Sequence, residues 1–340
     1  MTEPPIPTQL RVESQPVIGV DQRPRIRHAE WAIGTAVLGR PAYINTGSAT
    51  ALPAGRSPEA LRDNTDAVLD AAMAAGIDWV DTARSYGDAE TFVGDWMNRR
   101  SSDATFVPPT VSSKWGYAYV GEWRTDADVH EVKQHSVDQF RRQWAETQQR
   151  IGTVVGLYQV HSLTADSPLF DDDELIGALA ELPKASVAVG FSTSGPRQAE
   201  AVRRALSLSV DGRPLFSAVQ STWNVLEPSV GTALGEAKAA GMTVLLKECL
   251  ANGRLVTEPP EPVATMAAGA GVGADAIALA AAAHQPFADR VILGPADSAQ
   301  LRSNLLADRV ELTENEWSTL RALAEPVDEY WQRRAELPWS

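Results

Sequence analysis

The sequence predicts an α/β protein folded as a single closed (β/α)8 barrel, the TIM-barrel architecture, and three observations lead to this prediction. Eight short apolar runs follow one another along the chain, and each is followed by a longer amphipathic stretch. The runs are apolar and do not alternate with polar residues, as expected for a parallel sheet that is buried on both faces. Eight is also the number of strands at which such a sheet closes into a barrel.

The expected strands lie in runs rich in β-branched and aromatic residues. An alternative is a doubly wound open sheet, whose first strand should be followed by the phosphate-binding pattern G-x-G-x-x-G. That pattern is missing from AIGTAVLGR, so the barrel is preferred. The eight runs are WAIGTAVLG at 31–39, IDWVDTA at 77–83, PTVSSKWG at 109–116, VVGLYQVHS at 154–162, SVAVGFSTS at 186–194, FSAVQSTWN at 216–224, MTVLLKE at 242–248 and RVILGPA at 290–296.

Helices are expected between these runs. The first should begin after Ser57, a candidate N-cap, with Pro58 in its first turn. The segment 259–273 is rich in Pro, Ala and Gly and is expected to be a loop. After the eighth unit Thr313 and Glu316 form a capping box, which predicts one extra terminal helix followed by a tail. The helices are expected at 58–75, after YGDAE at 86–90, and at 126–150, 172–182, 196–208, 229–240, 274–284 and 299–307.

Composition limits the classes of function. The chain has 340 residues and a net charge of -14, which argues against a nucleic-acid or anionic-membrane partner. A single cysteine, Cys249, excludes an intrachain disulfide and a zinc cluster built on thiolates, and no metal site is expected. No apolar run approaches the length of a membrane span, so a cytoplasmic protein is expected. Residues 1–27 are expected to form a flexible arm and 28–340 a single barrel domain.

Polar side chains are placed at the carboxyl ends of the expected strands, where the active sites of such barrels lie. Asp81 follows the second strand, Lys114 the third and His161 the fourth, and Tyr86 comes five residues after Asp81. Strand ends could close with Ser, Asn or Gly, so three titratable groups on consecutive strands indicate one site.

An Asp, a Tyr, a Lys and a His together suit proton donation by a phenol, which is a sluggish acid near neutral pH. An ammonium beside the phenol favours loss of its proton, and a carboxylate behind the ammonium holds that charge in place. Histidine can orient the carbonyl oxygen that receives the proton. An alternative is a lyase or isomerase that forms a Schiff base on Lys114.

Several of these stretches resemble the aldo-keto reductases in sequence and in order. They are GIDWVDTARSYGDAETFVG, VSSKWG, LYQVHS, VGFSTSG, VQSTWN, VLLKECLANGRL and VILGPADSAQLRSN, and the resemblance covers about residues 31–308. It implies a (β/α)8 barrel that binds a nicotinamide cofactor in extended form and passes hydride to or from a carbonyl carbon. It also implies that Tyr86 is the general acid or base, that Lys114 and Asp81 tune it, and that His161 orients the carbonyl. A non-catalytic, nicotinamide-binding regulatory barrel is the alternative.

The resemblance also implies residues for the cofactor. Lys247 occupies a place where an aromatic ring commonly stacks on the nicotinamide, and Gln300 a place where members that prefer NADPH often carry Arg. The resemblance favours NADP(H) over NAD(H), because members of the family more often use NADP(H). Arg302 is the candidate residue for binding the 2′-phosphate of NADP(H). The expected cofactor-binding residues are Gly34, Thr35, Ser192, Thr193, Gln220, Lys247, Leu250, Gly253, Gly294, Gln300, Arg302 and Asn304.

The substrate is expected to be a small carbonyl compound or alcohol. Apolar pockets are typically lined by aromatic rings. The loop after the third strand, with the sixth strand's end, therefore supplies the candidates Trp115, Tyr117, Trp123 and Trp223.

Overall fold

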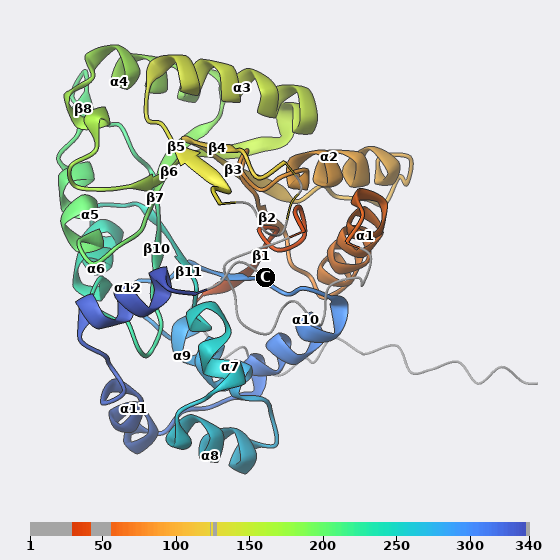
Figure 1. Ribbon diagram of the computed structural model, residues 1–340, viewed down its shortest axis with the longest axis vertical. Helices are drawn as coiled ribbons and strands as arrows, with labels where there is room; N and C mark the ends of the chain where they lie inside the picture. The colour runs from red at the N-terminus through yellow and green to blue at the C-terminus, as the bar shows by residue number, and fades with distance from the viewer. Residues whose placement is uncertain (1–28, 42–55, 123, 125–127, 338–340) are drawn as a thin grey trace, which may run out of the picture.

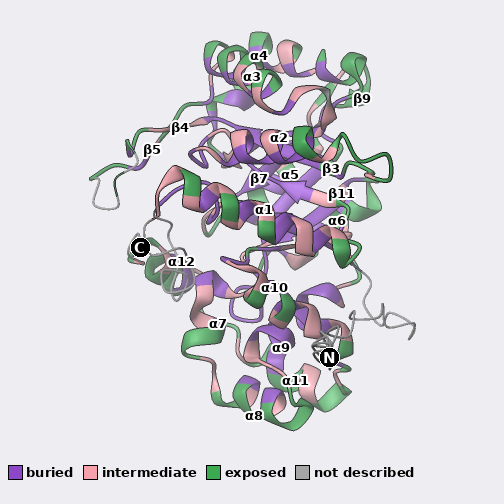
Figure 2. Ribbon diagram, turned by 90° about the vertical axis from the view of Figure 1, so that its right-hand side faces the viewer, coloured by how far each residue is buried: buried purple, intermediate pink, exposed green. Residues whose placement is uncertain are grey.

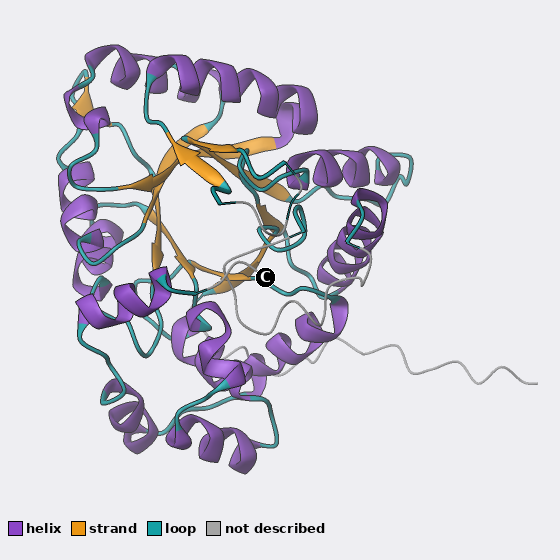
Figure 3. Cartoon of the chain, in the orientation of Figure 1, coloured by secondary structure: helices purple, strands orange, loops and turns teal. Residues whose placement is uncertain are grey.

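The computed structural model describes residues 29–41, 56–122, 124 and 128–337. Within them eight parallel strands close into a barrel in the order β1-β12-β11-β10-β7-β6-β3-β2, with helices around it (Figures 1 and 3). The predicted fold is confirmed, and the expected arm at 1–27 lies outside the described residues. The barrel strands are β1 Glu30–Gly34, β2 Trp79–Asp81, β3 Thr110–Trp115, β6 Val155–Leu163, β7 Ala188–Thr193, β10 Ala218–Thr222, β11 Thr243–Lys247 and β12 Arg290–Leu293.

The helices follow the strands in the predicted alternation. The Ser57 hydroxyl accepts the Ala60 N–H and caps the first helix, as its position predicted. The capping box of Thr313 and Glu316 is present as well. The helices are α1 Pro58–Ala74, α2 Ala89–Arg100, α3 Val137–Ile151, α4 Asp173–Leu179, α5 Gln198–Leu206, α6 Gly231–Ala239, α7 Arg254–Thr257, α8 Glu261–Ala270, α9 Ala274–Ala283, α10 Ser298–Asn304, α11 Glu314–Arg321 and α12 Val327–Ala335.

The expected helix at 126–150 was too long at its start. An antiparallel hairpin precedes it, in which β4 (Tyr117–Tyr119) pairs with β5 (Glu131–Lys133). The helix begins only after Ser136, whose hydroxyl accepts the Gln139 N–H. A second short hairpin joins β8 (Ser209–Val210) and β9 (Arg213–Pro214).

The prediction of a loop at 259–273 was wrong, because α8 lies there. Proline lies in the first turn of this helix, where a backbone N–H is not needed. The alanines that follow favour the helix, and it ends at Gly271, whose φ of 67° is in the left-handed region. Composition had suggested a loop because Pro and Gly were counted without regard to their positions.

The tail holds a second terminal helix that the sequence analysis did not predict. This helix, α12, lies at the same end of the molecule as the β4–β5 hairpin (Figure 2). Its rings are buried: Tyr330 is 1% exposed and Trp331 7%. The Tyr330 hydroxyl accepts the Asn224 side-chain N–H at 2.9 Å, which fixes the helix against the loop after β10.

The barrel interior is layered. Leu157, Ala218 and Leu245 form a small apolar cluster inside the ring. Because side chains two residues apart share a face of a strand, the residues after Leu157 and Ala218 on that face are Gln159 and Gln220. Polar groups therefore follow the apolar layer toward the carboxyl ends of the strands, and Figure 2 shows these strands buried at the centre.

Candidate active site

The four residues expected to act in catalysis come together at the carboxyl ends of their strands. Asp81 ends β2, Lys114 lies in β3, His161 lies in β6, and Tyr86 stands in the loop between β2 and α2. The Lys114 ammonium is 2.5 Å from an Asp81 oxygen and 3.4 Å from the Tyr86 hydroxyl oxygen. The rings of Tyr86 and His161 meet edge to face, with centroids 5.6 Å apart.

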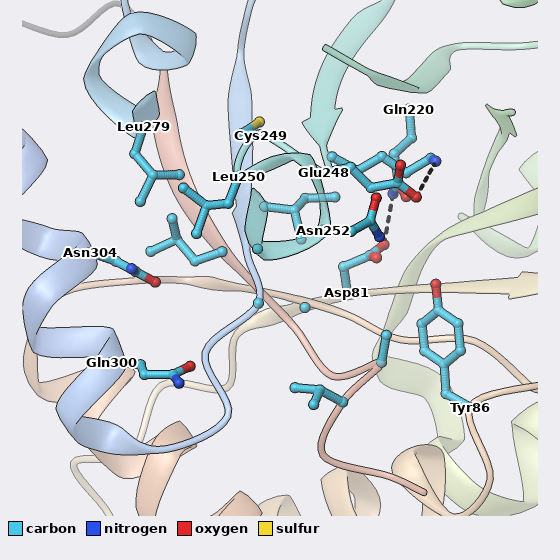
Figure 4. Close-up of a pocket in the computed structure, with 18 of the residues that line it drawn as sticks. Asp81, Tyr86, Gln220, Glu248, Cys249, Leu250, Asn252, Leu279, Gln300 and Asn304 are labelled. Atoms are coloured by element: carbon cyan, nitrogen blue, oxygen red, sulfur yellow. Dashed lines mark hydrogen bonds and ion pairs between the residues drawn. The ribbon is translucent and has the colours of Figure 1, made fainter. Parts of the chain in front are cut away.

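Asp81 is buried and its two oxygens are fully engaged. Oδ2 accepts a hydrogen bond from the Lys114 ammonium, which also donates to the Thr82 carbonyl oxygen at 2.9 Å. Oδ1 accepts from Ser112 Oγ at 2.7 Å and from Gln220 Nε2 at 3.0 Å (Figure 4). Each donor stabilises the carboxylate, so the Lys114 ammonium has a fixed, charged counter-ion.

Burial raises the pKa of Tyr86 well above the ordinary value of 10.0, and the Asp81 carboxylate adds to the rise. The Arg40 guanidinium, 5.1 Å from the ring centroid, acts in the opposite direction. An ammonium beside the phenol would by itself ease loss of the proton, as predicted from the sequence. In the structure the balance favours the protonated phenol, so Tyr86 holds a proton that it can donate.

His161 is kept neutral by its surroundings. Burial lowers its pKa well below the ordinary 6.5, and the nearby Lys114 and Lys247 ammonium groups lower it further. A neutral imidazole has one N–H donor and one acceptor nitrogen. Its Nδ1 is 3.4 Å from Ser85 Oγ, and a ring nitrogen of His135 contacts the His161 carbonyl oxygen at 2.9 Å.

A cavity of about 460 Å³ extends from these residues to the start of α10. Figure 4 shows Tyr86, Asp81 and Glu248 on one side of it and Leu279, Gln300 and Asn304 on the other. We call the first side the tetrad end, lined by Arg40, Asp81, Tyr86, Tyr117, Glu131, His161, Gln220, Lys247, Glu248 and Arg334. We call the second side the α10 end, lined by Asp275, Leu279, Gly294, Gln300, Ser303 and Asn304.

Charged pairs line the tetrad end beyond the four expected residues. Arg40 lies 2.7 Å from Glu131 of the hairpin. Glu248 accepts two hydrogen bonds from the Arg334 guanidinium of α12, at 2.8 and 2.5 Å, and Lys247 is 3.4 Å away. Burial by itself raises the pKa of Glu248. The Arg334 guanidinium and the Lys247 ammonium outweigh this effect and hold the pKa far below its ordinary value. The tetrad end of the cavity is therefore polar and lined by ion pairs.

Not all the expected cofactor residues line the cavity. Thr35 lies beside it and donates its hydroxyl and its N–H to the Asp81 carbonyl, at 3.2 and 3.0 Å. Ser192 accepts the Ser162 N–H, and Thr193 contacts Ser221 Oγ at 2.7 Å. The residues that do line it are Gly34, Gln220, Lys247, Leu250, Gly253, Gly294, Gln300 and Asn304.

Two of the expected substrate-pocket rings belong instead to the core. Trp115 follows the inward-pointing Lys114 in β3, so it faces the helices, where it is fully buried against Phe140. Trp223 is 5% exposed and packs against Phe287. Neither lines the cavity, whereas Tyr117 does. Trp123 lies outside the described residues.

Arg302 also departs from its expected place. Its side chain is exposed on α10, donates to Ser298 Oγ at 3.4 Å and does not line the cavity. Its neighbour Ser303 lines the cavity instead. Arg302 is therefore not positioned as a cavity residue in this structure.

Arg40, Glu131 and Arg334 line the cavity but were not among the residues predicted from the sequence. Arg40 pairs with a residue 91 positions away, and Arg334 with one 86 positions away. The sequence feature that could have indicated Arg40 is a basic residue soon after the first strand. No feature of the sequence indicates Arg334, because its position in the cavity depends on a tail helix that was not predicted.

Two broader observations concern metals and membranes. Within residues 29–41, 56–122, 124 and 128–337, no group of three or more His, Cys, Asp or Glu could hold a metal ion. In the same part of the chain no single helix is long and apolar enough to cross a membrane. The pair α8 and α9 meets that test only when taken together, and it is bent by 96°.

Comparison with known families gives one extensive match. The model described as the Aldo/keto reductase family matches residues 50–325. The aldo-keto reductase str7 of Strobilurus tenacellus is 27% identical over 194 residues, which are 55% of this chain and 51% of that protein. The match thus spans about half the length of this curated relative.

Solved structures of the same architecture are similar in fold. An aldo-keto reductase of Bacillus halodurans, solved in its holo form, has a TM-score of 0.61 and 20% identity, covering 87% of this chain and 92% of that one. A Pseudomonas aeruginosa protein assigned to the aldo-keto reductases has a TM-score of 0.58 and 19% identity, covering 82% of this chain and 89% of that one. At these identities the likeness concerns the fold alone.

Proposed function

Because this chain belongs to the aldo/keto reductase family, we propose that it catalyses hydride transfer between a nicotinamide cofactor and a small carbonyl compound or alcohol. The observation that carries the proposal is the contact of Asp81, Lys114 and Tyr86 with His161 beside them, all at one end of a long cavity. At this level the proposal covers both NAD(H) and NADP(H). The cytoplasmic location and the lack of a nucleic-acid partner stay predictions from composition.

The cavity suits an extended dinucleotide. It runs from the tetrad end to the α10 end, with polar side chains at both ends and Leu250 between them (Figure 4). A Cβ built on Gly294 would meet nothing within 4 Å, so bare backbone borders open space there. When bound, the cofactor supplies or accepts the hydride at the carbonyl carbon.

The protein's part in the reaction is proton transfer and orientation. In reduction, the Tyr86 phenol donates its proton to the carbonyl oxygen as the carbon receives hydride. The Lys114 ammonium, 3.4 Å away, stabilises the phenolate that remains, and Asp81 holds that ammonium in place. The neutral His161 donates a hydrogen bond to the carbonyl oxygen and orients it. Oxidation of an alcohol follows the same path in reverse.

Two alternatives fit the site less well. A regulatory barrel without catalysis would not need all four residues, and here all four meet. A Schiff base on Lys114 would need a neutral amine open to substrate. The Lys114 ammonium is fully buried, bonded to Asp81 and Thr82, and does not line the cavity. We therefore expect borohydride to trap no carbonyl substrate on Lys114.

The pH profile of turnover tests the state of His161. Its pKa is lowered by burial and by nearby cations, so it should gain a proton only well below pH 6.5. We expect kcat for carbonyl reduction to stay level between about pH 6 and 8, the range in which a histidine with an ordinary pKa would titrate. A measured loss of activity with a midpoint near 6.5 in wild type, absent in His161→Gln, would contradict this assignment.

Arg334 is expected to hold polar groups of the substrate. Its guanidinium reaches the cavity from α12 and is bonded to Glu248. In Arg334→Met we expect KM for a hydroxylated aldehyde to rise by about tenfold, the loss of one charge-assisted hydrogen bond, with a smaller change in kcat.

The matched control is Arg333→Met. Arg333 is the neighbouring residue on α12, and it pairs with Glu325 and Glu329 outside the cavity. Its KM should stay near that of wild type. A direct role for Arg334 would be contradicted if the two substitutions raised KM equally. It would also be contradicted if a fall in melting temperature accounted for the rise in KM of Arg334→Met.

A further inference from the structure

One carboxylate lines the α10 end of the cavity. Asp275, in the first turn of α9, lines the cavity and is 6% exposed. Its Oδ2 accepts the Asn304 side-chain N–H at 2.8 Å. Its Oδ1 lies against Gly273 at the start of α9, and no hydrogen bond to it is found among the residues that the structure describes. An acid is therefore fixed at the α10 end of the cavity, beside Asn304.

A second carboxylate lies at the start of α10 but does not line the cavity. Asp297 caps this helix and accepts the Gln300 N–H at 2.7 Å. Gln300 in turn uses its side-chain oxygen to accept the Ala296 N–H at 2.8 Å. These donors, which could otherwise bind a phosphate, are engaged within the protein.

The cations of the cavity are at the other end. Arg40, Lys247 and Arg334 line the tetrad end, where they pair with Glu131 and Glu248. Within the described part of the chain, no Lys, Arg or His lines the α10 end.

These charges bear on the one chemical difference between the two nicotinamide cofactors. NADP(H) carries a phosphate on the adenosine 2′-oxygen, and NAD(H) has a hydroxyl there. Sites for the phosphate commonly provide Arg, whereas sites for the hydroxyl commonly provide Asp or Glu as an acceptor. A phosphate next to a fixed carboxylate is repelled, and its desolvation is not compensated.

We propose that this protein binds NAD(H) in preference to NADP(H), and that Asp275 is the residue that selects against the 2′-phosphate. This inference rests on the proposed function. It is opposite to the preference for NADP(H) that the resemblance to the family implied. It assigns selectivity to a residue of α9, outside the sequence stretch at 294–304 from which the preference had been judged.

The test is direct titration of the purified full chain with NADH and with NADPH, by calorimetry at one ionic strength. We expect wild type to bind NADH at least about tenfold more tightly, a difference of about 1.4 kcal/mol. Asp275→Asn should reduce this ratio by weakening the repulsion of NADPH. Equal or tighter binding of NADPH by wild type would overturn the proposal, as would an unchanged ratio in Asp275→Asn.

Two control variants separate local from general effects of charge. Asp173→Asn removes the same charge from the exposed surface of α4, across the barrel from α10 (Figure 1), and should leave the ratio unchanged. Arg302→Met should also leave it unchanged. A selective loss of NADPH affinity in Arg302→Met would show that Arg302 serves the phosphate and would overturn the proposal. Binding of neither cofactor would instead contradict the proposed function itself.

Discussion

Tyr86→Phe is expected to abolish most turnover while leaving folding and cofactor binding intact. The substitution removes one oxygen and keeps the ring, which contacts His161 edge to face and lies beneath the Arg40 guanidinium. General acid catalysis typically contributes about 10²–10⁴-fold, so kcat should fall by at least about that factor. The comparison to make is steady-state kcat on a good carbonyl substrate, beside the Kd of the cofactor.

Tyr117→Phe is the matched control for this loss. Tyr117 is the other tyrosine of the tetrad end, and its ring packs against His161 with centroids 5.0 Å apart. Removing its hydroxyl should change kcat far less than Tyr86→Phe does. If Tyr86→Phe keeps near-full activity with cofactor affinity unchanged, Tyr86 is not the proton donor, and Asp81 and Tyr86 serve only the structure of their loop.

Lys114→Met should be almost as damaging, for two reasons. The phenolate left after proton donation loses the ammonium that stabilises it. The buried Asp81 carboxylate also loses its cation, and breaking a buried pair from one side costs about 3–5 kcal/mol of stability. Thermal melting should therefore show a destabilised protein, and the measured loss of kcat combines both effects.

The double variant Asp81→Asn, Lys114→Met separates the two effects, because it removes both charges of the pair. We expect it to recover part of the stability and none of the activity. Tyr86→Phe combined with Lys114→Met should cost much less than the product of the single losses, since groups that act as a unit are not additive. Losses that multiply would show instead that the two residues act independently.

The barrel and its four central residues were predictable because both depend on local patterns. Each apolar run is a strand, and strand periodicity fixes which residues point inward once one of them is known. Asp81 and Lys114 are inward residues of neighbouring strands, so their contact follows from strand order. The same alternation places Trp115, next to Lys114, in the outer core, and the sequence analysis did not apply it there.

The rest of the site could not be read from the sequence because it depends on contacts between distant segments. Arg40 reaches a hairpin hidden within a stretch expected to be helix, and Arg334 comes from a tail helix with no clear apolar pattern. The electrostatic state of Tyr86 depends on how deeply it is buried, which no local pattern gives. Asp275 could not be singled out because it lies at the start of the expected helix at 274–284, away from the strand ends where site residues were sought.

The most direct test of the proposed function follows the hydride itself. Purified protein would be given a carbonyl substrate with NADH that carries deuterium at both C4 positions of the nicotinamide, and the alcohol product would be examined by mass spectrometry. We expect one deuterium at the former carbonyl carbon in the wild-type reaction, and almost no product from Tyr86→Phe at equal cofactor occupancy. Product without deuterium, or no product from sugars, aromatic aldehydes, quinones and keto-lactones although the cofactor binds, would contradict the proposal that this barrel is a hydride-transferring enzyme.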